Sequence, residues 1–157
     1  MKRLVYVDNN ATTRVAPEAL EAMLPYFTEL YGNPSSMHTF GGQLQKKINQ
    51  AREQVANLIG ASPQEIIFTS GGTESDNAAI RGTLEANPDK KHIITTRVEH
   101  PAVLNLCQYL AQNGYEVTEL GVDSQGLLDL DELHGAIRDD TVLITIMYAN
   151  NETGVLF

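Results

Sequence analysis

The sequence predicts an α/β fold in which helices flank a mainly parallel sheet. Short runs rich in β-branched residues alternate with segments whose apolar residues recur every three or four positions, which is typical of strands joined by crossover helices. The runs also lack polar alternation, as in the TVLITIM stretch at 141–147, and this indicates strands that are covered on both faces.

The first part of the chain predicts one short strand and two helices. Residues 4–7, LVYV, form a β-like run that a polar turn closes. Pro17 suits the first turn of a helix of about 14 residues. A loop rich in Gly, Pro and Ser covers 31–39, and apolar residues at helical spacing then predict a helix over 44–59 that Gly60 ends.

From residue 65 onward, predicted strands and helices alternate. The predicted strands are 65–69, 92–95, 115–120 and 141–147, and the predicted helices are 73–86, 101–113 and 130–138. Pro101 stands where a helix should begin and Gly114 where it should end. This order predicts about four parallel strands with a helix in each crossover.

Composition narrows the classes of function. The chain has 157 residues, of which 42% are hydrophobic and 20% charged, so we expect about one folded domain. The formal net charge of −9, without a basic cluster, disfavours a nucleic-acid partner. No apolar run approaches the roughly 18 residues that span a membrane, and the amino end lacks the apolar core of a signal peptide. We therefore expect a cytoplasmic protein without a membrane partner.

The single cysteine, Cys107, excludes an internal disulfide and a cysteine-based zinc site. A lone cysteine could be a nucleophile, but Cys107 stands among apolar residues at helical spacing, where a cysteine is usually a small buried hydrophobe. The four histidines, His38, His92, His100 and His134, lack the spacing of metal ligands. We predict no metal site in this chain.

The most specific local pattern is the turn after the strand predicted at 65–69. Gly71 and Gly72 precede Thr73 at the start of a predicted helix. The N–H groups at a helix amino end attract an anion, and glycine lets the backbone approach it closely. The pattern is not a nucleotide P-loop, because its lysine is absent. A tight turn with Thr73 or Ser75 as the helix cap would explain the same residues, and both interpretations stay open.

Two further polar segments follow predicted strands. His100 could stack on a planar cofactor or move protons, or it could only cap the next helix. Asn150 and Asn151 could hydrogen-bond a ligand, or they could form an ordinary turn. Because the carboxyl ends of parallel strands converge at one edge of a sheet, we expect these segments and the turn at 71–72 around one crevice.

Two polar loops, 8–13 and 32–38, could join this crevice, although their Asn, Gly and Pro residues are also common in turns. The chain stops on an apolar tripeptide, 155–157, directly after a turn. This ending suggests a truncated sequence whose next element is missing, and the alternative is a complete small protein with a frayed tail.

Five segments in this order resemble the cysteine desulfurases, which are pyridoxal-phosphate enzymes of the class V aminotransferase family. They read YVDNNATT, YGNPSSMHTFG, IIFTSGGTESDNAAI, TTRVEHPAV and MYANNETG, and the resemblance runs from about residue 4 to 157. The residues of these segments are most similar to those of the nitrogen-fixation (NifS-like) branch. The resemblance implies an N-terminal fragment of the aminotransferase-like (fold type I) enzymes. Residues 1–13 would be an arm that joins a small domain, and 14–157 the first half of the large cofactor domain.

The resemblance also implies roles for matched residues. Gly72 and Thr73 would bind the phosphate of pyridoxal 5'-phosphate, His100 would stack on its ring and help move protons, and Asn151 would hydrogen-bond the ring hydroxyl oxygen. Three asparagines would lie in segments that border the substrate pocket: Asn9, Asn10 and Asn33.

The implied reaction removes sulfur from L-cysteine, leaves L-alanine and forms a persulfide on an enzyme cysteine. The sulfur would pass to an iron–sulfur scaffold protein, in this branch for nitrogenase, and the full-length enzyme would be a homodimer. In the family, the Schiff-base lysine and the persulfide cysteine lie beyond the position of Phe157, and Cys107 does not match the latter. We therefore expect this chain alone to be inactive.

Two alternatives remain. A selenocysteine lyase, or another aminotransferase-like pyridoxal-phosphate enzyme, would share the phosphate turn and the stacking ring. A short non-catalytic protein that acts by binding would be a different class altogether, and an incomplete sheet argues against it because exposed strand edges fold poorly.

Overall fold

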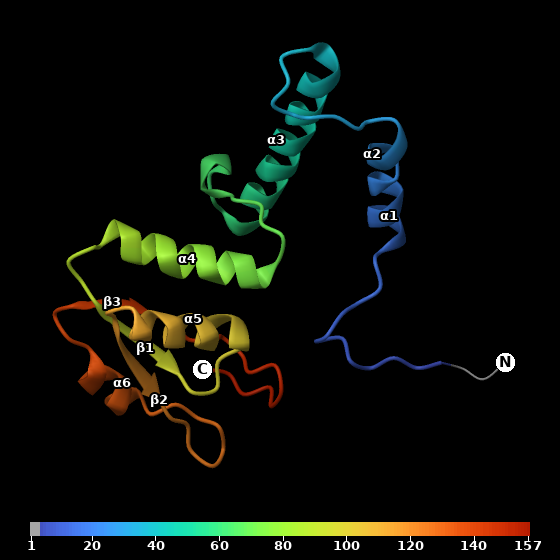
Figure 1. Cartoon of the computed structure of the whole chain (residues 1–157). Helices are drawn as coiled ribbons and strands as arrows, with labels where there is room; N and C mark the ends of the chain where they lie inside the picture. The colour runs from blue at the N-terminus through green and yellow to red at the C-terminus, as the bar shows by residue number, and fades with distance from the viewer. Residues whose placement is uncertain (1–3) are drawn as a thin grey trace. The chain divides into compact units, whose positions relative to one another are not determined.

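The computed structural model describes residues 4–157, which form two compact units (Figure 1). The first unit ends at Phe68, and the second runs from Thr69 to Phe157. No helix among the described residues is both long enough and apolar enough to cross a membrane. The division into an arm at 1–13 and a domain at 14–157 stays a prediction, and residues 1–3 of that arm lie outside the described residues.

The second unit contains the sheet. Its elements in chain order are α4 (Gly72–Ala86), β1 (His92–Thr96), α5 (Pro101–Gln112), β2 (Glu116–Leu120), α6 (Leu130–Ala136) and β3 (Thr141–Ile144). The three strands are parallel, and β1 lies between the other two in the order β2-β1-β3. The predicted class, a parallel sheet with flanking helices, is confirmed.

The core of this unit lies between two helices and the central strand. Helix α4 packs against α5 and β3, and α5 also packs against β2 (Figure 1). All five residues of β1 are buried, as is usual for a strand with a neighbour on each side and helices against it. The buried apolar cluster consists of Ile80, Leu84, Ile93, Val103, Leu106, Cys107 and Leu110.

The first unit is helical. It contains α1 (Pro17–Met23), α2 (Pro25–Thr28), α3 (Thr39–Ile59) and the short 3₁₀ helix η1 (Pro63–Glu65). The single helix of about 14 residues predicted from Pro17 is wrong, because proline has no N–H to continue a helix and Pro25 begins a second one.

Helix α3 begins earlier than the predicted residue 44. His38 Nδ1 accepts a hydrogen bond from Gly41 N at 3.2 Å, so this histidine caps a helix start at Thr39. The helix ends before Gly60, as predicted. Gly60 has a φ of 71°, a left-handed conformation that glycine adopts without strain.

Two predicted strands do not form in the described residues, and the sheet has three strands there. Residues 4–7 form no strand, and neither do 65–69. The carbonyl of Ile66 accepts a hydrogen bond from the guanidinium of Arg52, and the Ile67 side chain is 79% exposed. An extended run becomes a strand only where a second backbone takes up its N–H and C=O groups. Neither run has that partner in the described part of the chain.

Candidate functional site

The amino end of α4 is an uncovered stretch of backbone. Gly71 occupies the N-cap position with an extended backbone, and it has no side chain that could cap the helix. A Cβ added at Gly71 or Gly72 would meet no described atom within 4 Å. Residues 71–73 are exposed, so an anion can approach the amino end of this 15-residue helix, where the partial positive charge of the first-turn N–H groups suits it.

Hydroxyl groups hold this turn in place. The Thr69 and Ser75 hydroxyl oxygens lie 2.7 Å apart, and they lie 3.1 and 3.2 Å from the carbonyl oxygen of Gly71. Because each hydroxyl has one proton, one of them donates to the other, and the second donates to the Gly71 carbonyl. Because Gly71 is the N-cap, the alternative in which Thr73 or Ser75 caps α4 is wrong. The sequence supplies a braced turn that leaves the exposed Thr73 side chain for another partner.

The acidic residue in this turn is directed away from the helix end. Glu74 Oε2 accepts a hydrogen bond from Ser70 N at 2.6 Å. This hydrogen-bonding to Ser70 lowers the pKa of the Glu74 carboxyl below its ordinary value. The carboxylate is thereby held on the backbone N–H before the turn, and an anion at the first-turn N–H groups does not have to replace it.

His100 stands at the N-cap position of α5. Its Nδ1 accepts a hydrogen bond from Ala102 N at 3.1 Å, so the interpretation of this histidine as a helix cap is confirmed. Capping does not exclude a second role, because the imidazole is exposed and has a second nitrogen. With Nδ1 accepting from the backbone, Nε2 is the atom that can hold or exchange a proton with a ligand.

Thr73 and His100 line the same cavity, which has a volume of about 450 Å³. The link between them is Asn77, whose Nδ2 donates to the carbonyl of Thr73 at 2.9 Å and to the carbonyl of Ala102 at 3.3 Å. One amide thus joins the first turn of α4 to the first turn of α5. Asn77 was missed by the sequence reasoning, although its position four residues after Thr73 places it on the same helix face.

The loop that contains Asn151 lies beside the segment that precedes His100. Met147 N donates to Glu99 Oε1 at 2.7 Å, and Asn150 Nδ2 donates to the carbonyl of Val98 at 3.2 Å. The strand predicted to end at 147 therefore ends earlier, at Ile144, because the chain turns toward Glu99. Figure 1 shows this loop at the same end of the second unit as the amino ends of α4 and α5.

Asn151 is exposed, and its Nδ2 donates to Glu152 Oε1 at 3.0 Å. It belongs to the loop neighbouring His100 and is not among the residues that line the cavity of Thr73 and His100. The structure therefore brings two of the four predicted cofactor contacts, Thr73 and His100, into one cavity. Gly72 directly precedes Thr73 at the start of α4, and Asn151 lies on an adjoining loop of the same unit.

The three asparagines predicted near a substrate pocket belong to the first unit. Asn9 and Asn10 lie in an exposed turn in which Ala11 N donates to the carbonyl of Asp8 at 3.3 Å. Asn33 Oδ1 accepts a hydrogen bond from Ser35 N at 2.9 Å, which is ordinary turn chemistry. Their place at a substrate pocket stays a prediction.

Cys107 is completely buried in α5. Burial, with smaller contributions from Glu119 and Glu99, raises the pKa of its thiol to about 11. The thiol is therefore protonated at neutral pH, and the interpretation of Cys107 as a small core hydrophobe is confirmed. Within residues 4–157, no three His, Cys, Asp or Glu side chains gather as metal ligands would.

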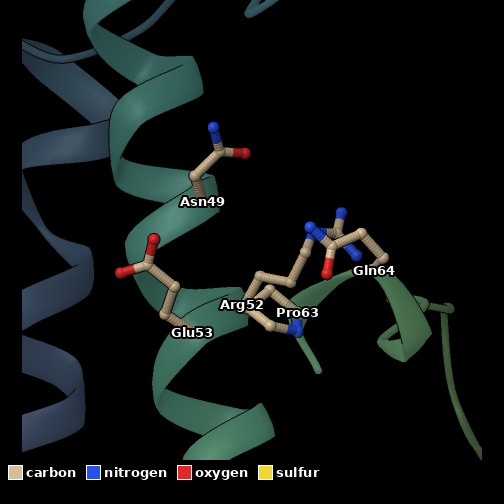
Figure 2. Close-up of a pocket in the computed structure, with 5 residues that line it drawn as sticks. All are labelled: Asn49, Arg52, Glu53, Pro63 and Gln64. Atoms are coloured by element: carbon tan, nitrogen blue, oxygen red, sulfur yellow. The ribbon is translucent and has the colours of Figure 1, made fainter. Parts of the chain in front are cut away.

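A second cavity, of about 470 Å³, lies in the first unit between α3 and η1 (Figure 2). Asn49, Arg52 and Glu53 line it from the helix, and Pro63 and Gln64 from the other side. The Arg52 side chain donates to the carbonyl of Ile66, and its guanidinium carbon lies 5.0 Å from the centre of the Phe68 ring. The guanidinium of Arg52 therefore already has partners within the first unit.

The comparisons with known proteins decide the family. The sequence profile of the class-V aminotransferases matches residues 5–157. The chain belongs to the class-V aminotransferase family. It is 64% identical over 154 residues to a protein of a Nostoc species named cysteine desulfurase, covering 98% of this chain and 38% of that protein.

Solved structures of this family share the fold. A NifS-like protein superposes with a TM-score of 0.92 at 46% identity, over 97% of this chain and 42% of the other. SspA, solved in complex with cysteine, superposes with a TM-score of 0.86 at 41% identity, over 93% of this chain and 42% of the other. The fold is that of part of the NifS-like pyridoxal-phosphate enzymes, and the chain spans about two fifths of the length of the relatives it matches.

Proposed function

We propose that this chain supplies the cofactor-binding segments of a pyridoxal-phosphate-dependent cysteine desulfurase. The observation that carries the proposal is the cavity of about 450 Å³ that Thr73 and His100 line together. An uncapped helix end and an exposed imidazole at one cavity suit a ligand that has a phosphate at one end and a flat ring at the other.

The phosphate end of pyridoxal phosphate fits the start of α4. The backbone at Gly72 is open, so a phosphate oxygen can approach the first-turn N–H groups without meeting a side chain. The Thr73 hydroxyl can donate one further hydrogen bond. The braced hydroxyls of Thr69 and Ser75 keep this cup in shape before the phosphate arrives.

His100 would contact the ring. Its Nδ1 is held by Ala102 N, which orients the imidazole plane and leaves Nε2 to hold or pass a proton. Asn151 would donate to the ring hydroxyl oxygen from the loop beside it. The cofactor, when bound, supplies the sink for electrons, and the protein residues bind and orient it.

The proposed substrate is L-cysteine, and the products are L-alanine and a persulfide on an enzyme cysteine. The structure of SspA with cysteine, at 41% identity, supports this substrate class. Asn9, Asn10 and Asn33 would border its pocket. Cys107 cannot accept the sulfur, because it is buried and protonated. The chain of 157 residues would therefore bind the cofactor without catalysing the reaction.

We propose an iron–sulfur scaffold protein as the sulfur acceptor, with nitrogenase maturation as the destination, and a homodimer at the full length of the relatives. We also propose the cytoplasm as the compartment, an arm at 1–13, and the first half of the large cofactor domain at 14–157.

Pyridoxal 5'-phosphate and pyridoxal, which lacks the phosphate, provide a matched test. Each is titrated into the ¹⁵N-labelled chain, and the amide shifts of Gly72 and Thr73 are followed. We expect both amides to shift in a saturable way with pyridoxal 5'-phosphate, and pyridoxal to leave them unchanged. Equal responses to the two ligands would contradict the phosphate cup. Release of sulfide from cysteine by this chain with the cofactor would contradict its predicted inactivity.

A further inference from the structure

Two loops at the site are joined by two hydrogen bonds, and in each of them a side chain of one loop contacts the backbone of the other. From the first loop, Glu99 Oε1 accepts a hydrogen bond from Met147 N of the second at 2.7 Å. From the second, Asn150 Nδ2 donates to the carbonyl of Val98 in the first at 3.2 Å. Each loop thus contributes one side chain and one backbone group. We call these two hydrogen bonds the clasp.

The Glu99 half of the clasp is built into the interior. Glu99 is only 7% exposed, and Oε1 also accepts a hydrogen bond from Thr96 Oγ1 at 3.1 Å. Burying a carboxyl group is costly, and the two donors at one oxygen offset part of that cost. An acidic residue adds little to the stability of the sheet at this position, since an apolar side chain would fill the same space. Its backbone link to Met147 is what an apolar residue could not provide.

The Asn150 half organises its own loop as well. Its Oδ1 accepts hydrogen bonds from Glu152 N at 3.0 Å and Thr153 N at 2.9 Å, which closes the turn around Asn151. Its Nδ2 is therefore the part of the amide that reaches the other loop. The two functions of this side chain reside on different atoms, so a substitution can remove one and keep the other.

We infer that Glu99 and Asn150 are positioning residues that fix His100 and Asn151 relative to each other. The inference rests on the proposed function in taking His100 and Asn151 as contacts of the cofactor ring. Each of these residues directly follows a member of the clasp in the chain. Because a side chain's direction follows its backbone, a clasp one residue away constrains how both side chains are directed.

Three variants separate the clasp from local packing. Glu99→Ala removes the acceptor, and Glu99→Gln keeps an oxygen at the same place. Asn150→Asp keeps the oxygen that closes its own turn and loses the N–H that reaches Val98. Hydrogen exchange of the Met147 amide and ¹H–¹⁵N spectra of the His100 ring and the Asn151 side chain are recorded without ligand, and far-UV circular dichroism checks the fold.

We expect Glu99→Ala to speed exchange of the Met147 amide about tenfold, as loss of its hydrogen bond should. It should also shift the Asn151 side-chain resonances on the opposite loop, and Glu99→Gln should restore both signals. Asn150→Asp should shift the His100 ring resonances. Effects confined to the loop that carries the substitution would overturn the inference. Should Glu99→Ala unfold the chain, Asn150→Asp alone decides, because its turn bonds remain.

The same samples keep the two proposals apart. Addition of pyridoxal 5'-phosphate to the unsubstituted chain tests the proposed function, whereas the ligand-free spectra test the clasp. If the resonances of Thr73 and His100 do not respond to the cofactor, the proposed function is contradicted. The ligand-free spectra would still decide whether the clasp positions His100 and Asn151. With both proposals correct, Glu99→Ala should weaken cofactor-induced shifts at Asn151, and Glu99→Gln should retain them.

Discussion

The imidazole of His92 lies between the two outer strands of the sheet and reaches a hydroxyl on each. Its Nε2 is 2.8 Å from Thr118 Oγ1 on β2, and its Nδ1 is 2.8 Å from Thr141 Oγ1 on β3. The ring is fully buried. A neutral imidazole, with one donor and one acceptor nitrogen, matches two hydroxyls that can each donate or accept.

This arrangement predicts a stability that falls in mild acid. Burial, followed by the charge of Arg138, lowers the pKa of His92, and the nearby carboxylates of Asp140 and Glu116 oppose that shift only in part. The unfolded chain therefore binds a proton first as the pH drops through about 6.5, the ordinary value for histidine. Stability is complete above that pH and decreases below it, toward the lower pKa of the folded state.

Urea unfolding at pH 7.5 and 5.5 measures the effect. We expect a lower midpoint at pH 5.5, and a smaller difference in His92→Gln, which does not titrate there. His134 is exposed and provides the matched control, so His134→Gln should keep the full pH dependence. A pH dependence that survives His92→Gln and disappears in His134→Gln would refute this assignment.

Asn77→Ala should loosen the contact between the first turns of α4 and α5. It removes both hydrogen bonds from Asn77 Nδ2 and leaves the Ala102 carbonyl without that donor, so we expect a loss of about 1–2 kcal/mol of stability. Asn87, the C-cap residue of α4, is the control, because its Nδ2 donates to a carbonyl of that same helix, that of Thr83, at 2.8 Å. A chemical denaturation curve of each variant checks this, and equal losses would argue against a special role for Asn77.

Gly72→Ala should separate folding from ligand binding. Because a Cβ there meets nothing and alanine favours a helix, we expect a stability unchanged or raised by up to about 1 kcal/mol. The same methyl group would stand over the helix end and weaken binding of pyridoxal 5'-phosphate. Gly82 also has open space and lies within α4 away from its start, so Gly82→Ala should raise stability and leave affinity unchanged. Unaltered affinity in Gly72→Ala would count against the phosphate cup.

Cys107 should be unreactive in the folded chain. With a buried thiol whose pKa is raised to about 11, we expect modification by a disulfide reagent at pH 7.5 to be about a hundredfold slower than in the unfolded chain. The absorbance of the released thiolate follows both rates. Rapid modification under native conditions would show that α5 opens readily or that the thiol is accessible.

Local patterns sufficed for most of the second unit. The strand at 92–96 and the helix that begins at Pro101 follow from a β-branched run and from proline at a helix start, which are signals within a few residues. The run at 65–69 carries a similar apolar signal. The predicted strand does not form there because a strand also needs a neighbouring backbone, and the sequence does not indicate where that backbone lies.

The sequence points to single candidate residues and to a shared crevice, but not to the side chains that link the segments. Gly72, Thr73 and His100 stand out because glycine pairs and a histidine before a helix are visible in one dimension. Asn77 and Glu99 act through hydrogen bonds to Ala102 and Met147, which lie 25 and 48 positions along the chain. Such links depend on the packing of helices and loops, and no periodicity in the sequence reports them.

The strand order also bears on how the chain acquires its site in time. His92 is 26 positions from Thr118 but 49 from Thr141, so closing the second connection costs about 0.6 kcal/mol more loop entropy. We expect β1, α5 and β2 to assemble first, with β3 joining last. Because the loop after β3 carries Asn151, this asparagine would reach the segment before His100 only after β1, α5 and β2 have assembled. During synthesis, those three elements leave the ribosome before β3 and its loop do.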